Sequence, residues 1–216
     1  MNHLLPVLAL APKTGDEPLH GPGAPVGATL RDFWQWSASD LVNNAMRGML
    51  AEFIVATLLD SRQTLRVEWD AVDLHTPDGL AIEVKSAAYV QSWAQREHSA
   101  IGFDVGRKRA FDPATNDYSG ELRRHADVYV FCLLAHLDQE TIDPLDLAQW
   151  RFFVLSAAHI DRELGAQKRV GLARLRAMGA VEVGAAEVRA AVRAAGASAA
   201  SSRTSGLSEP AEASPC

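Results

Sequence analysis

Residues 126–134 restrict the fold of this chain more than any other segment. They read Ala-Asp-Val-Tyr-Val-Phe-Cys-Leu-Leu, which is almost continuously apolar and rich in residues that favour strands. A strand with two apolar faces needs cover on both of them, as is typical of the centre of an α/β sheet. The segment therefore predicts an α/β fold with a central mixed β-sheet flanked by helices.

A helix and a hairpin are expected before this strand. Ser39-Asp40 can cap a helix whose apolar residues recur at helical spacing to about Leu59. Residues 65–74 and 80–85 are strand-like, and Thr76-Pro77-Asp78-Gly79 between them is a strong turn signal. We expect the two segments to pair as a hairpin.

Weaker patterns indicate the remaining elements. Residues 111–120 have the composition of a loop. Short strands are expected at residues 101–105 and 150–155, a helix from residue 156, and a closing Ala-rich helix over residues 184–195.

The predicted hairpin gathers charged side chains on one face. Glu83 and Lys85 share a face of their strand because side chains alternate along it. If the hairpin loop has three residues, position 83 lies opposite position 73, so Asp73 joins this face. Two carboxylates suit Mg²⁺, and a nearby ammonium can position or help deprotonate water at a phosphodiester.

At these residues the chain resembles the PD-(D/E)XK nuclease superfamily, which has the restriction-endonuclease-like fold. The resemblance covers residues 40–134. It implies Asp73 and Glu83 as metal ligands and Lys85 as the group that orients or activates water. On the preceding helix it implies Glu52 as a catalytic-site carboxylate that completes the metal shell or its second sphere. It also implies a Mg²⁺-dependent nuclease, with Mn²⁺ as a substitute, that acts on DNA.

Three alternatives stay open. Asp78, in the dipeptide Pro77-Asp78, could replace Asp73, although an Asp before Gly suits a turn. The chain could be a catalytically silent member of the fold that serves binding or assembly in a defence or repair complex. The charged residues could also form only a solvated ion-pair cluster, unless Glu52 and the hairpin residues share one concave site.

Nucleic-acid contacts are predicted after the hairpin. A Gln soon after the Glu-x-Lys strand recurs in some nucleases of this superfamily, which makes Gln91 and Gln95 candidates. Arg107-Lys108-Arg109 form a dense basic strip suited to phosphates, with Arg123 and Arg124 as a second choice. The formal net charge of −6 is unlike that of an avid duplex-DNA binder, so a local strip has to supply the cations.

The chain is long enough for one substantial core, because 48% of its 216 residues are hydrophobic. We expect a flexible Pro/Gly-rich arm at residues 1–28, a single domain at 29–195, and a disordered Ala/Ser-rich tail at 196–216. The apolar opening lacks a basic leader, and no run is long enough to span a bilayer, so a cytoplasmic protein is expected. Nucleases that cut two strands often pair subunits, which suits a homodimer.

Overall fold

Strand β6 (Val128–Leu134) lies at the centre of a sheet, and all of its residues are buried. The computed structural model describes residues 4–23, 26–62 and 65–205. Its main sheet has the order β1-β2-β6-β7-β9, in which β2 and β6 are parallel and the other pairs are antiparallel. The other strands of this sheet are β1 (Leu74–His75), β2 (Ala81–Ala88), β7 (Trp150–Ser156) and β9 (Val181–Val183), of which β2 and β7 flank β6. The predicted α/β class with a mixed central sheet is confirmed.

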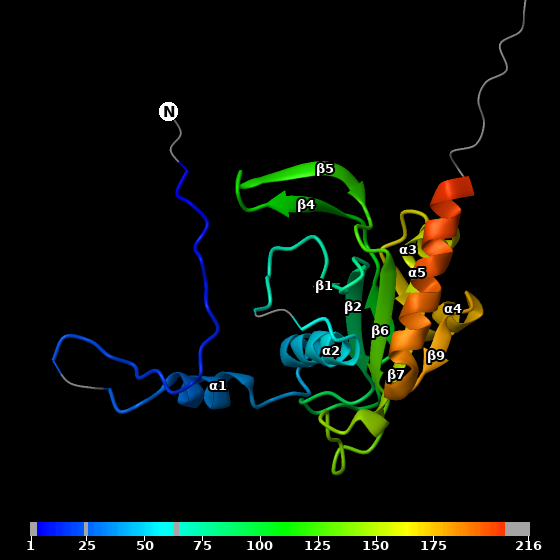
Figure 1. The fold of residues 1–216 in the computed structure, drawn as a ribbon. Helices are drawn as coiled ribbons and strands as arrows, with labels where there is room; N and C mark the ends of the chain where they lie inside the picture. The colour runs from blue at the N-terminus through cyan, green and yellow to red at the C-terminus, as the bar shows by residue number, and fades with distance from the viewer. Residues whose placement is uncertain (1–3, 24–25, 63–64, 206–216) are drawn as a thin grey trace, which may run out of the picture.

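Alternate side chains of β6 enter two separate apolar cores. Val128 and Val130 lie in the core that also contains residues of α2 (Asn44–Leu58) and α5 (Val188–Ser205). Tyr129 and Phe131 lie in the core that contains residues of α3 (Ala157–Leu164) and α4 (Leu172–Ala177). The ribbon of β3 (Gly102–Asp104) and β8 (Arg169–Gly171) adds to this second core. Figure 1 shows α2 beside β2 and α5 beside β7.

The predicted hairpin has the expected register but a much shorter first strand. Leu74 pairs with Ile82, and Thr76 N–H donates to Leu80 O at 2.9 Å, which leaves Pro77, Asp78 and Gly79 as the loop. Gly79 has a φ of 88°, a conformation that glycine adopts without steric cost. Residues 65–73 were expected in the strand, but those described here form bends and turns. The paired residues end at Leu74 and Ile82, but Asp73 stays beside β2, because its N–H donates to Ile82 O at 3.1 Å.

The helix expected from Ser39-Asp40 begins later, at Asn44. Asn43 is its N-cap and accepts from Met46 N–H at 3.0 Å, while Asp40 accepts from Val42 and Asn43 in the preceding turn. Several Ser, Asp and Asn side chains could cap this helix, and only the backbone path decides which one does.

Helix α1 (Leu30–Ala38) was not predicted. Thr29 and Asp32 form its capping box, a signal that the sequence offers. None of its residues is buried, and it stands away from the sheet in Figure 1. Among the described residues before α1, Pro18 forms an isolated bridge with Thr29. The flexibility of residues 1–28 stays a prediction, and residues 1–3 and 24–25 lie outside the described residues.

Two predicted irregular segments contain regular structure. Residues 111–120 were expected to be a loop, but they belong to a hairpin of β4 (Lys108–Asp112) and β5 (Asp117–Arg123). Asn116 turns this hairpin with a φ of 56°, which Asn tolerates better than most residues. The tail predicted at residues 196–216 is helical as far as Ser205, because α5 continues through the Ala-rich stretch, and residues 206–216 lie outside the description. No helix in the described part of the chain is long and apolar enough to cross a membrane.

Candidate functional site

The β1–β2 pairing places three of the predicted residues together. Asp73 immediately precedes β1, and Glu83 and Lys85 lie on β2. Asp73 Oδ2 accepts from the Val84 N–H at 2.7 Å, and Lys85 Nζ donates to Glu83 Oε1 at 2.6 Å. The Glu83 side chain is only 4% exposed. An ionised carboxylate is stable at such depth only when it is paired, so this is a buried charge cluster and not a solvated surface pair.

A second lysine completes the environment of Glu83. Lys108, at the start of β4, places Nζ 3.0 Å from Glu83 Oε1 and 3.2 Å from Oε2. Its side chain is 42% exposed, whereas that of Lys85 is 26% exposed. Sequence reasoning assigned Lys108 to a phosphate strip and missed this contact. No local pattern indicates it, because 25 residues separate the two partners.

Burial and neighbouring charges shift the pKa values of Asp73 and Lys85. Burial, followed by the charge of Glu83, raises the pKa of Asp73 from 3.8 to about 6, although the Val84 N–H and Lys85 oppose the change. Burial lowers the pKa of Lys85, but the charges of Glu83, Asp73 and Asp104 more than offset it, and the net direction is upward. Lys85 is therefore a firmly protonated ammonium, suited to orienting water or a phosphate oxygen and not to accepting a proton.

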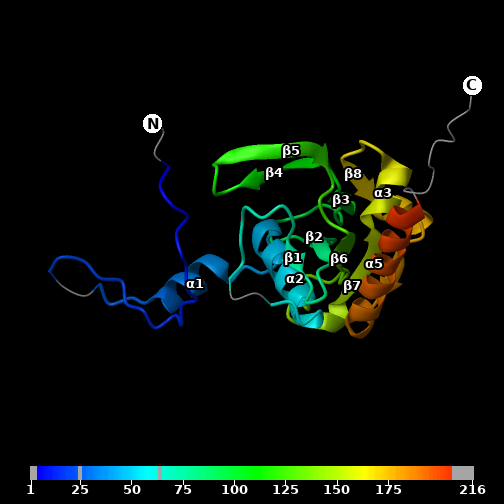
Figure 2. The ribbon, with the colours of Figure 1, turned by 45° about the horizontal axis from the view of Figure 1, so that its top comes forward.

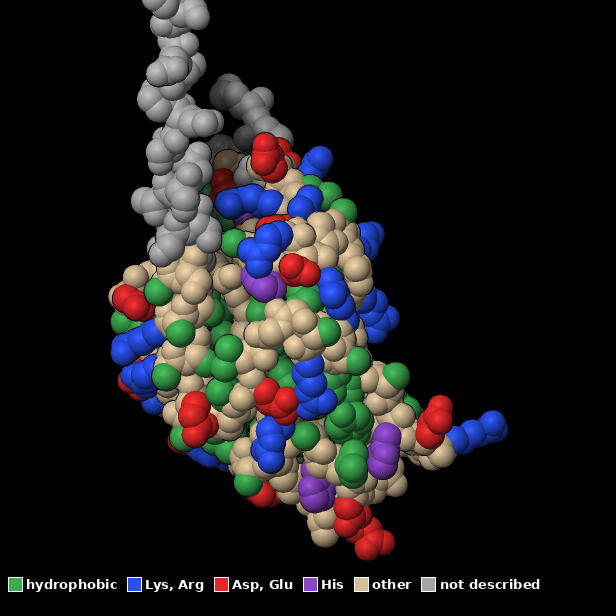
Figure 3. Space-filling model, turned by 90° about the vertical axis from the view of Figure 1, so that its right-hand side faces the viewer, with side chains coloured by type: hydrophobic (Ala, Val, Ile, Leu, Met, Phe, Trp, Pro, Cys, Tyr) green, Lys and Arg blue, Asp and Glu red, His purple; other side chains and the backbone are tan. Residues whose placement is uncertain are grey.

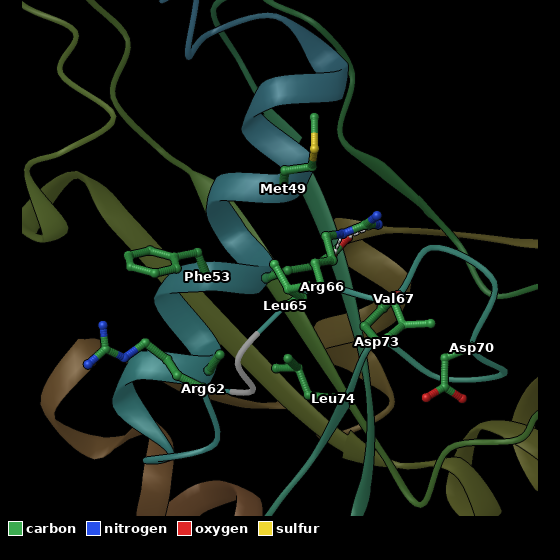
Figure 4. A pocket seen from close by; sticks show the side chains of 11 residues that line it. Met49, Phe53, Arg62, Leu65, Arg66, Val67, Asp70, Asp73 and Leu74 are labelled. Atoms are coloured by element: carbon green, nitrogen blue, oxygen red, sulfur yellow. Dashed lines mark hydrogen bonds and ion pairs between the residues drawn. The ribbon is translucent and has the colours of Figure 1, made fainter. Parts of the chain in front are cut away.

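Glu52 and Asp73 line the same cavity, which has a volume of about 510 Å³. Figure 4 labels Asp73 among the side chains of the cavity wall. Met49, Phe53 and Val67 supply apolar parts of its wall. The Glu52 carboxylate pairs with Arg66, whose Nε lies 2.5 Å from Oε2 and whose Nη2 lies 3.1 Å from Oε1. Glu52 therefore shares a concavity with Asp73, while Arg66, which sequence reasoning also missed, engages its oxygens.

Asp70 and Asp78, the two aspartates on either side of Asp73 in the chain, occupy different places. Asp70 lines the same cavity as Asp73. Asp78 lies in the hairpin loop and lines a separate depression with Asp60 and Arg189. The geometry therefore favours Asp73 over Asp78 as the partner of Glu83.

Asp73 and Glu83 are the oxygen donors that a divalent cation would use in this cluster. Within the described residues, no three His, Cys, Asp or Glu side chains are grouped so that they could hold a metal ion. Mg²⁺ does not require three, since it commonly binds through one or two carboxylates and keeps water or substrate phosphate as its other ligands. Asp73 and Glu83 are hard oxygen donors of this kind, and Lys108 would have to leave Glu83 for an ion to reach both oxygens of that carboxylate.

The two predicted glutamines are engaged inside the protein. They lie in a loop, not on a helix, and Gln91 is buried. Gln91 Nε2 donates to Ala88 O at 2.9 Å, and Gln95 Oε1 accepts from the Gln91 N–H at 2.7 Å. Ser99 Oγ accepts from both side-chain amides. These contacts hold the loop that follows β2. Because they occupy the side-chain amides of both residues, few hydrogen-bonding groups remain for a phosphate.

The basic strip divides into three separate roles. Arg107 pairs with Asp161 at 3.0 Å, Lys108 contacts Glu83, and Arg109 is exposed on β4. Arg124, the second choice for substrate contact, is buried and donates to Asp161 at 2.6 Å and to Val105 O at 2.7 Å, so it braces the fold. Arg123, the other residue of the second choice, is exposed at the end of β5, so Arg109 and Arg123 are the two that the structure leaves most accessible to a phosphate.

Within the described residues, the face that carries α3 and α5 has no run of Lys and Arg side chains that is free of nearby carboxylates (Figure 3). In Figure 3, Lys and Arg side chains are interspersed there with Asp and Glu. A phosphate backbone is attracted by a run of cations without nearby carboxylates. The face in Figure 3 therefore gives no support for contact with a polyanion.

Comparison with known families gives one match. The family described as Bacteriophage T4 endonuclease IV matches residues 30–169 of the chain. This span contains Glu52, Asp73, Glu83, Lys85 and Lys108. No curated protein matches the sequence significantly.

Proposed function

Because this chain belongs to the bacteriophage T4 endonuclease IV family, we propose that it is a nuclease that hydrolyses DNA with the help of Mg²⁺, or of Mn²⁺ in its place. We further propose that its α/β fold is restriction-endonuclease-like and that its centre is of the PD-(D/E)XK type. One observation carries the proposal: the β1–β2 register brings Asp73, Glu83 and Lys85 together, next to the cavity that contains Glu52.

Each residue has a distinct part in the proposed reaction. Asp73 and Glu83 would hold the metal ion, which would supply charge stabilisation at the phosphodiester and a more acidic water. Lys85 Nζ, held by Glu83, orients the attacking water and stabilises charge on a phosphate oxygen. Glu52 adds negative charge beside Asp73, and Arg66 fixes its side chain.

A silent binding module is the second candidate, and one observation favours it. Both oxygens of Glu83 are already contacted by ammonium groups, as in a permanently neutralised ion cluster. A protein of this kind would bind nucleic acid or a partner without cutting it. Metal-dependent turnover separates it from the nuclease.

The direct test measures cleavage of labelled DNA and RNA of several forms with Mg²⁺, with Mn²⁺ and with a chelator. We expect strand cleavage with either metal, loss of cleavage on chelation, and recovery when metal is restored. Binding without cleavage under every metal condition would favour the silent module. Equal cleavage of RNA and DNA would overturn the proposed preference for DNA.

A Lys108 variant tests whether this lysine competes with a metal ion for Glu83. Replacing Lys108 with methionine removes one ammonium from Glu83, so we expect Mn²⁺ to bind the free protein several-fold more tightly. The same change should weaken nucleic-acid affinity and reduce its salt slope by about 1, because one cation is lost near the phosphates. Calorimetric titration and binding at several salt concentrations measure the two effects.

Arg109→Met is the matched control, since Arg109 is the next residue on the same strand and is exposed. It should reduce the salt slope but leave Mn²⁺ affinity unchanged. Equal metal affinity in the wild type and the Lys108 variant would contradict the view that Lys108 competes with the ion.

A further inference from the structure

Three aromatic rings lie in contact beside the candidate centre, of which two are exposed and the middle one is partly buried. Trp69 lies in the segment before β1, Phe111 on β4 and Tyr118 on β5. The ring centroids of Trp69 and Phe111 are 5.7 Å apart, and those of Phe111 and Tyr118 are 5.2 Å apart. Trp69 is 59% and Tyr118 is 58% exposed. We call these three residues the aromatic platform.

We propose that the aromatic platform is a nucleobase-binding subsite, which stacks one base of the substrate strand and thereby sets which phosphodiester reaches the centre. The proposal rests on the proposed nuclease function and adds a binding site to it. A nucleobase has two flat faces, so it covers an exposed aromatic ring without requiring a hydrogen bond of fixed geometry. The large exposed areas of Trp69 and Tyr118 are available for such cover.

The position of the platform connects it to the charged cluster. Phe111 is three residues from Lys108 along β4, a span of about 10 Å at the rise of a strand. Lys108 reaches Glu83, and Trp69 is four residues before Asp73 in the chain. Figures 1 and 2 both show the β4–β5 hairpin extending over the segment that leads into β1. A base on the platform would therefore hold its own strand close to Asp73 and Glu83.

Other exposed aromatic side chains lack this relation to the centre. Phe33 and Trp36 contact each other on α1, at a centroid distance of 6.4 Å, but α1 stands apart from the sheet. Trp93 is 53% exposed and follows β2 in a loop. Within the part of the chain that the structure describes, only the platform combines ring contact, exposure and a strand shared with a lysine of the cluster, so it is the surface that continues the proposed site.

The experiment measures binding of short single-stranded DNA oligonucleotides in chelator, which prevents cleavage. Trp69→Leu and Tyr118→Leu keep an apolar side chain but remove the ring, and each should weaken affinity on the order of 10-fold. Neither should change the salt slope, because no phosphate contact is lost. Trp93→Leu, the control at another exposed tryptophan, should bind like the wild type.

A second measurement uses the ligand instead of the protein. One nucleotide at a time is replaced by an abasic analogue, and one position should cost the wild type far more affinity than the others. Trp69→Leu should lose this dependence on position. Trp69→Phe should keep it, but should lose part of the tryptophan fluorescence quenching that accompanies binding in the wild type.

The outcomes separate the subsite from the nuclease proposal. Wild-type protein that cleaves and binds, but shows neither abasic dependence nor an effect of the leucine variants, would overturn the subsite alone. Failure of the wild type to bind any oligonucleotide would overturn the proposed function first. If Trp69→Leu proves unfolded by circular dichroism, the abasic series on the wild type and the Trp69→Phe variant still decide the question.

Discussion

Replacing Lys85 with methionine is expected to slow cleavage by about 10³-fold while leaving nucleic-acid affinity within about twofold of the wild type. Lys85 is a largely enclosed ammonium that Glu83 holds at 2.6 Å, and its raised pKa keeps it charged across the neutral range. A cation in this position acts mainly on the charge that develops during the reaction, so its loss should affect the rate more than binding. Single-turnover cleavage rates and equilibrium binding in chelator measure the two quantities.

Arg109→Met is the matched control for this loss of charge. Arg109 is exposed, so its loss should weaken binding and flatten the salt dependence but should leave the single-turnover rate at saturating enzyme nearly unchanged. The two variants should thus show opposite signatures. A Lys85 variant that cleaves at the wild-type rate would remove Lys85 from the proposed mechanism.

Asp73→Asn is expected to abolish cleavage and to stabilise the fold at alkaline pH. The pKa of Asp73 is about 6 in the folded protein and 3.8 as the ordinary value. A raised carboxyl pKa means that folding favours the protonated form, so this contribution to stability is complete below about pH 4 and is lost as the pH rises through 6. Asparagine is neutral at every pH and can still accept from the Val84 N–H. We therefore expect the free energy of unfolding at pH 8 to rise by about 2 kcal/mol, with almost no difference at pH 4.

Urea unfolding at pH 4 and pH 8 checks this result, with Asp78→Asn as the control. Asp78 lies in the loop of the same hairpin, and the Thr76 hydroxyl lowers its pKa, which is the opposite direction. The Asp78 variant should keep its cleavage activity and should gain no stability at pH 8. Stabilisation of both variants, or of neither, would contradict the electrostatic strain assigned to Asp73. Loss of cleavage in the Asp78 variant alone would show that Asp78, and not Asp73, is the catalytic aspartate.

Regular patterns in the sequence were sufficient for the central elements. The apolar run at residues 126–134 predicted β6, because a strand that is buried on both faces has an almost continuously apolar sequence. The turn at residues 76–79 fixed the hairpin register, and with it the positions of Asp73 and Glu83 on one side. Period-two alternation then placed Lys85 beside Glu83.

Local patterns failed where strands are stabilised by distant contacts. Residues 65–73 have strand-like composition but do not continue the ladder, and residues 111–120 have loop-like composition but form most of a hairpin. Strand formation depends on what each residue packs against across the sheet, which local composition does not contain. The contacts among Trp69, Phe111 and Tyr118 illustrate this, because they join two segments that lie far apart in the sequence.

The sequence by itself determined the α/β class, the hairpin register and the meeting of Asp73, Glu83 and Lys85, because each follows from short-range periodicity or from one tight turn. Only the tertiary structure decided which cations face these carboxylates. Lys108 contacts Glu83, Arg66 pairs with Glu52, and Arg124 pairs with Asp161. The partners in each pair are at least 14 residues apart in the sequence. Charge interactions depend on distance and burial in space, so a basic run that looks uniform along the chain becomes three different environments once the strands have packed.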